Sequence, residues 1–312
     1  MPDWSTEITA LATQVRDHYV FAEAGGRVAD LLADRMPGYA DLTAEELAAR
    51  VTRDMQAVHP DPHLRLLYSE PVLPEQDEVR RLPGEAAAGR HGIAKVELLP
   101  GNVGLLDLRR LYTPDESAAA LTAALNVVAD TEVLILDLRR NTGGDPQTVA
   151  LICGYLFDGP IHVNDIEDRL LGVVRQYWTP VVLPGRKFGG HKPVHVLTSK
   201  DTFSGAEELA YDLRQLRRAT LIGERTRGGA HPSTRWRIAD HLMSSIPTAR
   251  AVNPVTGTNW EGTGVEPHIE ITADLAFDTA YRMALAHVLD LGDDGARRQQ
   301  AAEARDALAE LA

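Results

Sequence analysis

Apolar side chains recur at three- and four-residue spacing through the first 58 residues, as in amphipathic helices. One series occupies positions 8–19 and a second positions 28–35. A third begins at Thr43, where Thr43 and Glu46 fit a capping box. The pattern predicts a three-helix bundle, followed by a short strand over residues 64–68.

The pattern changes at residue 92, where short apolar runs begin to alternate with helix-like runs. The apolar runs read "GIAKVELL", "VGLLDL", "EVLILDL", "PVHVLT" and "ATLIGE", and the helix-like runs cover residues 115–129, 147–157 and 205–216. Such alternation predicts an α/β core with buried, largely parallel strands. Residues 162–178 are predicted to form a strand pair, residues 233–254 further strands, and residues 274–311 a closing helical segment.

These patterns divide the chain into three parts. Residues 1–68 are expected to form the helical bundle with its short strand, and residues 92–312 the α/β core with its C-terminal helix. The stretch between them, residues 69–91, is rich in Pro, Gly and charged residues. It is therefore expected to be a linker or a loop that acts as a lid.

Composition narrows the range of functions. The 312 residues are 44% hydrophobic and 25% charged, as in an ordinary soluble protein, and the formal net charge is −13. Nucleic acid is an unfavourable partner for such a chain, because phosphate binding needs clustered Lys and Arg. The single cysteine, Cys153, excludes a disulfide framework. The sequence shows neither a signal-peptide pattern nor an apolar run long enough to span a membrane, so a cytoplasmic location is expected.

Ser204 lies at a junction between a predicted strand and a predicted helix, in "SKDTFSGAEELA". One interpretation is a helix N-cap, because a serine hydroxyl accepts a backbone N–H of the first turn. The other is a nucleophile, because the N–H groups at the start of a helix can stabilise an oxyanion. The junction by itself favours the cap, so other segments have to decide.

Three further segments carry candidate chemistry. In "DLRRNTGG", Gly143 and Gly144 can form a tight turn or bring backbone N–H groups close to a developing negative charge. In "HPDPHLRLLY", His63 is either a structural histidine or a base. Glu261 follows Trp260 in a glycine-rich turn. No group of residues at metal-ligand spacing is apparent, and no metal or organic cofactor is expected.

Four strings occur in an order that resembles one family: "DLRRNTGG", "TFSGAEELA", "ATLIGERTRGGAHP" and "NWEGTGVEPHIEI". They resemble the serine peptidases that include C-terminal processing proteases, the tricorn protease core and the interphotoreceptor retinoid-binding protein repeats. The similarity covers about residues 92–275, and the helical unit looks like the N-terminal bundle of the retinoid-binding-protein-like branch. It implies a crotonase-like or ClpP-like α/β core.

The resemblance also implies roles by position. Ser204 matches the nucleophile, Gly205 one oxyanion donor, and Gly144 or Gly143 the other, with Gly144 favoured. Processing proteases take their base from a lysine, but Gly229 stands at that position here. The tricorn core uses a histidine and a glutamate instead, which match His63 and Glu261. His231, in "GGAHP", is the alternative base or a residue of the substrate groove.

The expected function is therefore hydrolysis of a peptide or small acyl substrate through a Ser204 acyl-enzyme. The short stretch at residues 69–91 has no room for a tail-binding PDZ domain, so specificity for C-terminal tails is not expected. Two alternatives remain open. One is a non-catalytic protein that binds lipophilic ligands, and the other is a biosynthetic hydrolase or acyl transferase acting on a small molecule. The oligomeric state is not predicted.

Overall fold

The computed structural model describes residues 3–74 and 84–311, which form two compact units. Unit 1 comprises Met1–Leu82, Ile166–Arg175 and His231–Val252. Unit 2 comprises Pro83–Asp165, Gln176–Ala230 and Asn253–Ala312. Part of the expected lid, residues 75–83, lies outside the described residues, and the rest of that stretch includes the short helix α4 (Glu85–Ala88).

Unit 1 is built from three helices and a small antiparallel sheet. The helices are α1 (Ser5–His18), α2 (Ala22–Arg35) and α3 (Ala44–Val58), and a 3-10 turn over Met36–Tyr39 joins the last two. Helix α3 begins with the predicted capping box: the Thr43 hydroxyl accepts from the N–H of Glu46, whose carboxylate accepts from the N–H of Thr43. The predicted bundle is confirmed.

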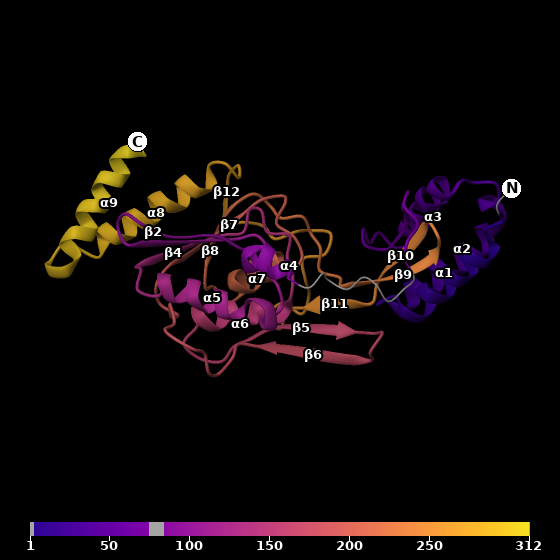
Figure 1. The fold of residues 1–312 in the computed structure, drawn as a ribbon, viewed down its shortest axis with the longest axis horizontal. Coiled ribbons are helices and arrows are strands. Elements are labelled where there is room, and N and C mark those ends of the chain that lie inside the picture. Colours follow the sequence, from indigo (N-terminus) through magenta and orange to yellow (C-terminus); the bar gives the residue numbers. More distant parts are fainter. Residues whose placement is uncertain (1–2, 75–83, 312) are drawn as a thin grey trace. The chain divides into compact units, whose positions relative to one another are not determined.

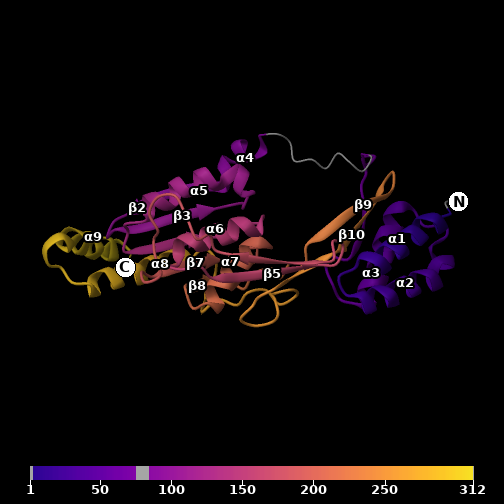
Figure 2. The same cartoon turned by 90° about the horizontal axis from the view of Figure 1, so that it is seen from below.

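The sheet of unit 1 joins segments that are distant in the sequence. Strand β1 (Arg65–Tyr68) pairs antiparallel with β10 (Leu242–Pro247), which pairs with β9 (Ser233–Ala239). Figure 2 shows this sheet beside α1 and α3. The structure thus places residues 231–252 with the N-terminal segment, whereas the sequence pattern assigns all of residues 92–312 to the core. A lone strand such as β1 needs a partner for its N–H and C=O groups, and β10 supplies it.

One core holds unit 1 together. Apolar side chains of all three helices pack against Leu64 and Leu66 around β1 and against Leu242 and Ile246 of β10. All four of these leucine and isoleucine side chains are almost fully buried. The hairpin therefore completes the hydrophobic core of the helical segment.

Unit 2 contains a six-stranded sheet, with the order β12-β8-β7-β4-β3-β2. Strands β2 and β3 pair antiparallel, and every other neighbouring pair in the sheet is parallel, as predicted. The strands are β2 (Ile93–Leu99), β3 (Val103–Leu108), β4 (Val133–Asp137), β7 (Val194–Thr198), β8 (Thr220–Gly223) and β12 (Ile269–Glu270). Every residue of β3, β4 and β7 is buried, which explains their continuous apolar runs.

Helices cover both faces of this sheet (Figure 1). On one face lie α5 (Pro114–Val128), α6 (Pro146–Leu156) and α7 (Gly205–Gln215). On the other lies α8 (Ala276–Asp290), whose small and apolar residues pack on the strands and on α9 (Arg298–Glu310). The result is the α/β core expected from the alternating pattern.

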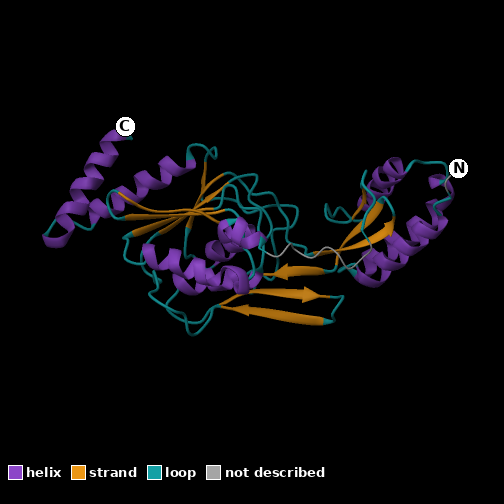
Figure 3. Cartoon of the chain, in the orientation of Figure 1, coloured by secondary structure: helices purple, strands orange, loops and turns teal. Residues whose placement is uncertain are grey.

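A third sheet has the order β11-β5-β6, in which β5 (His162–Asp168) and β6 (Val173–Trp178) form the predicted strand pair. Strand β11 (Ala249–Val252) completes it, as the colouring by secondary structure shows (Figure 3). Among residues 3–74 and 84–311, no helix combines the length and the apolar character needed to cross a bilayer.

Candidate active site

The candidate site begins at the carboxyl edge of the six-stranded sheet. Strands β4 and β7 are parallel neighbours, with Asp137 level with Leu197. The loops that follow them, residues 138–145 and 199–204, therefore leave the same edge side by side. The N–H of Phe203 donates to the carbonyl of Asn141 at 3.0 Å, which ties the two loops together.

Ser204 has an unusual backbone. It stands immediately before α7, at the N-cap position, with φ 55° and ψ −125°. An N-cap residue normally has extended backbone angles, so a simple capping role does not require this conformation. A positive φ in a non-glycine residue costs roughly 1–3 kcal/mol and persists only where the surroundings enforce it. A strained residue between a strand and a helix is also the geometry of the nucleophile elbow in α/β-hydrolases.

Gly143 and Gly144 enforce that conformation by close backbone packing. A Cβ atom on Gly143 would lie 2.7 Å from the Cβ of Ser204 and 2.7 Å from the nitrogen of Gly205. A Cβ on Gly205 would lie 2.7 Å from the carbonyl oxygen of Gly144. These approaches leave no room for a side chain at Gly143 or Gly205, and a Cβ on Gly144 would lie 1.8 Å from the carbonyl oxygen of Leu111. The glycines expected from the sequence to flank Ser204 do so.

The backbone N–H groups of these glycines differ in their partners. The N–H of Gly143 donates to Oδ1 of Asn141 at 2.8 Å. The contacts among the described residues give no acceptor for the N–H of Gly144 or of Gly205. Gly205 opens α7, where the first N–H groups of a helix lack intrahelical acceptors. Gly144 and Gly205 can therefore both donate to an oxyanion, whereas Gly143 is already engaged.

The side chain of Glu207 forms hydrogen bonds with the same segment. Its carboxylate accepts from the N–H of Ser204 at 2.8 Å and from the N–H groups of Gly228 and Gly229 at 2.6 and 2.9 Å. The hydroxyl of Thr226 is a fourth donor, at 2.5 Å. Burial raises the pKa of Glu207, and these four hydrogen bonds offset part of that rise. The carboxylate joins the Ser204 loop to the segment that follows β8.

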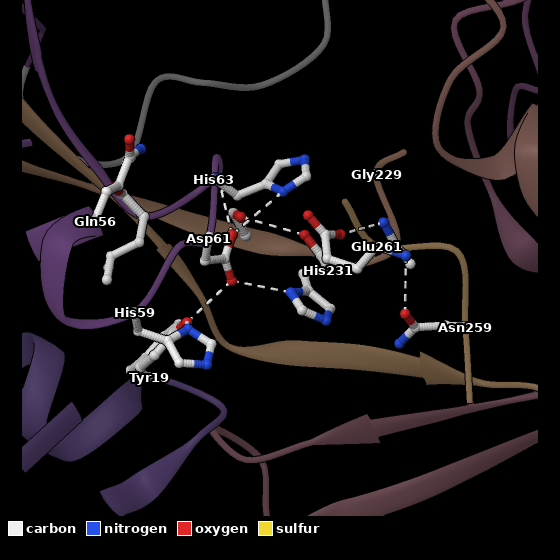
Figure 4. Close-up of polar contacts among 12 residues, drawn as sticks. Tyr19, Gln56, His59, Asp61, His63, Gly229, His231, Asn259 and Glu261 are labelled. Carbon is white, nitrogen blue, oxygen red and sulfur yellow. Dashed lines mark hydrogen bonds and ion pairs between the residues drawn. The ribbon is translucent and has the colours of Figure 1, made fainter. Parts of the chain in front are cut away.

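Glu261 also belongs to unit 2 and is half-buried. Its Oε2 accepts from the N–H of Ala230 at 2.5 Å, and its own N–H donates to Oδ1 of Asn259 at 2.9 Å (Figure 4). The neighbouring Trp260 is buried and donates from Nε1 to the carbonyl of Gly229 at 2.9 Å. The glycine-rich turn thus fixes the backbone around the carboxylate.

The histidines of the candidate site lie in unit 1, around the carboxylate of Asp61 (Figure 4). Oδ2 of Asp61 accepts from the hydroxyl of Tyr19 at 3.1 Å and lies 2.9 Å from Nδ1 of His231. Oδ1 accepts a hydrogen bond from the backbone N–H of His63 at 2.9 Å. Nδ1 of the His63 ring lies 3.5 Å from the same oxygen. His63 and His231, the two candidate bases predicted from the sequence, therefore both contact the buried carboxylate of Asp61.

Asp61 is ionised in these surroundings. Its side chain is 1% exposed, and burial alone would raise its pKa. The contacts with His231 and His63 outweigh burial and hold the pKa of Asp61 well below its usual range. A buried carboxylate with this many donors is a fixed negative charge.

Two sequence families match the chain. The profile of peptidase family S41 matches residues 102–271, more than half of the chain. The profile of the N-terminal domain of S41 peptidases in eukaryotic IRBP matches residues 4–90.

The chain belongs to peptidase family S41. It is a serine peptidase, as the resemblance implied.

Solved structures share the fold of this S41 peptidase. The photosystem II D1 C-terminal processing protease has a TM-score of 0.58 at 17% identity, over 88% of this chain and 95% of that one. A protein of Parabacteroides merdae reaches 0.63 at 15% identity, over 95% and 99%. The tricorn protease reaches 0.55 at 14% identity, over 86% of this chain and 34% of its own. The ClpP-like or crotonase-like core expected from the sequence is confirmed.

Asp61, Tyr19 and Glu207 of this S41 peptidase are not among the site residues that the sequence predicts. Asp61 stands two residues before His63, a spacing that could have drawn attention to it. Tyr19 looked like one more apolar position of the first helical series. Glu207 looked like an ordinary residue at the start of a helix. Their roles depend on partners far away in the sequence.

Proposed function

We propose that this S41 peptidase cleaves peptide bonds through an acyl-enzyme on Ser204, with His63 as the general base and Glu261 as the acid that orients it. The observation that carries the proposal is the strained backbone of Ser204, held by the backbone of Gly143 and Gly144. A serine in a strained backbone conformation, beside glycines that have no space for a side chain, suits a hydroxyl that reacts.

The reaction proceeds in two halves. The Ser204 hydroxyl attacks the scissile carbonyl and transfers its proton to His63, since a neutral serine is a weak nucleophile. The N–H groups of Gly144 and Gly205 donate to the tetrahedral oxyanion. His63 then protonates the leaving amine, and water hydrolyses the acyl-enzyme by the same path. The carboxylate of Glu261 stabilises the imidazolium.

The proposed triad draws on both units. Ser204 and Glu261 belong to unit 2 and His63 to unit 1. The S41 resemblance supports the assignment through the strings "TFSGAEELA", "NWEGTGVEP" and "DPHLRL". His231 is proposed as a support for the base, and its part is argued below.

A fluorophosphonate probe tests the nucleophile. We expect a covalent adduct on Ser204, located by mass spectrometry, and no adduct in Ser204→Ala. Turnover of a peptide substrate should fall by about 10⁴-fold or more in that variant, with an unchanged circular dichroism spectrum. Ser199→Ala is the matched control from the same loop and should keep the adduct. Peptide cleavage by folded Ser204→Ala would refute the serine mechanism.

The substrate is proposed to be a peptide, because family S41 consists of peptidases. An acyl-enzyme can also form from an ester of a small acid, so the two substrate classes need separate measurement. We expect kcat/KM for an internally quenched peptide library to exceed that for p-nitrophenyl esters. Hydrolysis of the esters alone would indicate a small-molecule hydrolase.

A further inference from the structure

The two oxygens of the Asp61 carboxylate have different partners. Oδ2 is engaged by the Tyr19 hydroxyl and by His231, at 3.1 and 2.9 Å. Oδ1 is engaged by His63 alone among the contacts given above, through its N–H at 2.9 Å and its Nδ1 at 3.5 Å. Oδ2 is thus held by Tyr19 and His231, and Oδ1 faces His63.

This division fixes the carboxylate in orientation. A carboxylate that is anchored through one oxygen by two groups cannot rotate without breaking both contacts. The loop that carries it is also tied down. The N–H of Asp61 donates to the carbonyl of His59 at 2.8 Å, and the N–H of Leu64 donates to the carbonyl of Asp61 at 3.1 Å. His63 therefore projects from a short, rigid turn.

Further titratable groups of unit 1 lie near Asp61. Nδ1 of His59 lies 2.6 Å from the Tyr19 hydroxyl, and burial lowers the pKa of His59. Arg27 acts on the same group at longer range, as does His231. Phe21 packs against the rings of both His59 and His231 and keeps this face apolar. Asp61 thus contacts Tyr19, His63 and His231, and His59 contacts the Tyr19 hydroxyl.

We propose that Asp61 is a positioning residue for the base: anchored by Tyr19 and His231, it orients His63 and stabilises the imidazolium that forms during catalysis. This inference rests on the proposed function, in which His63 takes the proton of Ser204. All four residues belong to unit 1, so the base is oriented within its own unit. The proposed function also assigns Glu261 to this base, and Asp61 is a second carboxylate with a separable effect.

Asp61→Asn is the direct test. The variant keeps the shape of the side chain and removes its charge, so an imidazolium at His63 loses its stabilising anion. We expect kcat/KM to fall by about 10²-fold or more, with a larger effect on kcat than on KM. The acid limb of the pH profile should move to lower pH by about one unit, because an opposite charge at this distance favours the protonated ring.

Asp54→Asn is the matched control. Asp54 is also a buried aspartate of unit 1, and it accepts from the Tyr39 hydroxyl at 2.9 Å. Its other partners are Arg35 and Arg50, and it contacts no histidine in the described structure. This variant should lose stability but keep the acid limb of wild type. An equal shift of the acid limb in both variants would show a structural effect and overturn the inference.

A second measurement does not depend on turnover. In a Ser204→Ala background, NMR titration of the His63 ring should show a midpoint at lower pH when Asp61→Asn is added. His63→Gln, His59→Gln and His231→Gln assign the signals. An unmoved midpoint would overturn the inference even if Ser204 is the nucleophile. Full turnover in Ser204→Ala alone would instead refute the proposed function and leave the titration result valid.

The roles of the two histidines also separate. His63→Gln should lower kcat/KM by about 10³-fold or more, whereas His231→Gln removes an anchor of Asp61 and should lower kcat/KM by about tenfold.

If Asp61→Asn fails to fold, Tyr19→Phe removes the other anchor of Asp61 and should lower kcat by a few fold with the acid limb unmoved. Wild-type kcat in both anchor variants would overturn the inference. An inactive His231→Gln beside an active His63→Gln would do so as well, since His231 would then be the base.

Discussion

The two units hold their parts of the proposed machinery in different ways. In unit 2, Ser204 is fixed by backbone packing, because Gly143, Gly144 and Gly205 approach too closely for any side chain. In unit 1, the carboxylate of Asp61 accepts a hydrogen bond from the backbone N–H of His63 and lies 3.5 Å from Nδ1 of its ring. We therefore expect the position of Ser204 to be disturbed by an added side-chain atom, and the orientation of His63 to be disturbed by loss of the Asp61 charge.

Buried carboxyl groups show the same contrast in their charge. Asp61 in unit 1 is held ionised by its donors. In unit 2, burial raises the pKa of Glu208 to about 8 and raises the pKa of Asp212 well above its ordinary value. One oxygen of each of these two groups has no partner in the described part of the chain. Of these three groups, the one whose contacts with hydrogen-bond donors outweigh the effect of burial is the charged one.

The largest effect on activity is expected from adding one methyl group at Gly143. Gly143→Ala would place Cβ 2.6 Å from the carbonyl oxygen of Phe203, at a φ of 91° that alanine avoids. The displaced loop should misplace the oxyanion donors and lower kcat by about 10²–10³-fold. Steady-state kinetics on a peptide substrate measure this. Gly159→Ala is the control, because nothing lies within 4 Å of its Cβ position, and near-wild-type kcat in Gly143→Ala would contradict the packing argument.

Glu207→Gln tests the carboxyl group that hydrogen-bonds to the Ser204 segment. An amide NH₂ would face N–H donors that now bind a carboxylate, so at least two donors lose a good acceptor. The free energy of unfolding should fall by about 3 kcal/mol, measured by urea denaturation and circular dichroism. Glu208→Gln, one residue along α7, should not lower it at neutral pH, because the raised pKa of Glu208 already costs the wild-type protein stability there. Equal losses in the two variants would show that burial alone matters.

The pH dependence of stability gives a smaller effect with a defined sign. The pKa of Glu208 is raised from 4.5 to about 8 in the folded state. The folded state therefore holds a proton that the unfolded state releases between these values. The contribution of Glu208 to the free energy of unfolding should therefore be most favourable below about pH 4.5. It should be lost progressively as the pH rises to about 8.

Glu208→Gln should flatten this dependence by up to about 1.4 kcal/mol per pH unit between pH 5 and 8. Urea denaturation across that range measures it. The exposed Glu270 offers the control, since Glu270→Gln should leave the slope as in wild type. An unchanged slope in Glu208→Gln would mean that the carboxyl group is already ionised when folded.

The smallest effect is expected at Cys153. Its thiol is fully buried in α6, and burial raises its pKa well above the ordinary value. Iodoacetamide at pH 8 should leave the native protein unlabelled and its activity unchanged, while protein unfolded in urea reacts fully. Mass spectrometry measures the label. Rapid labelling of the native protein would show that the core under α7 opens.

Local patterns in the sequence determined much of this protein. The three N-terminal helices, the capping box at Thr43, the alternating core and the parallel pairing of its buried strands follow from periodicity, turn residues and propensity within short windows. The four family strings likewise identified the S41 core. These features need no knowledge of distant partners, because each is stabilised or recognised within a segment of the chain.

Only the tertiary structure decided the environment of each candidate group. Asp61 and His231 are 170 residues apart in the sequence, and residues 231–252 join β1 rather than the core because that strand needs a partner. The positive φ of Ser204, the use of the Gly143 N–H by Asn141 and the four donors on Glu207 are set by close contacts between loops. Periodicity reports which face of an element is buried, whereas the charge of an acid and the orientation of a base depend on the atoms that other segments bring to it.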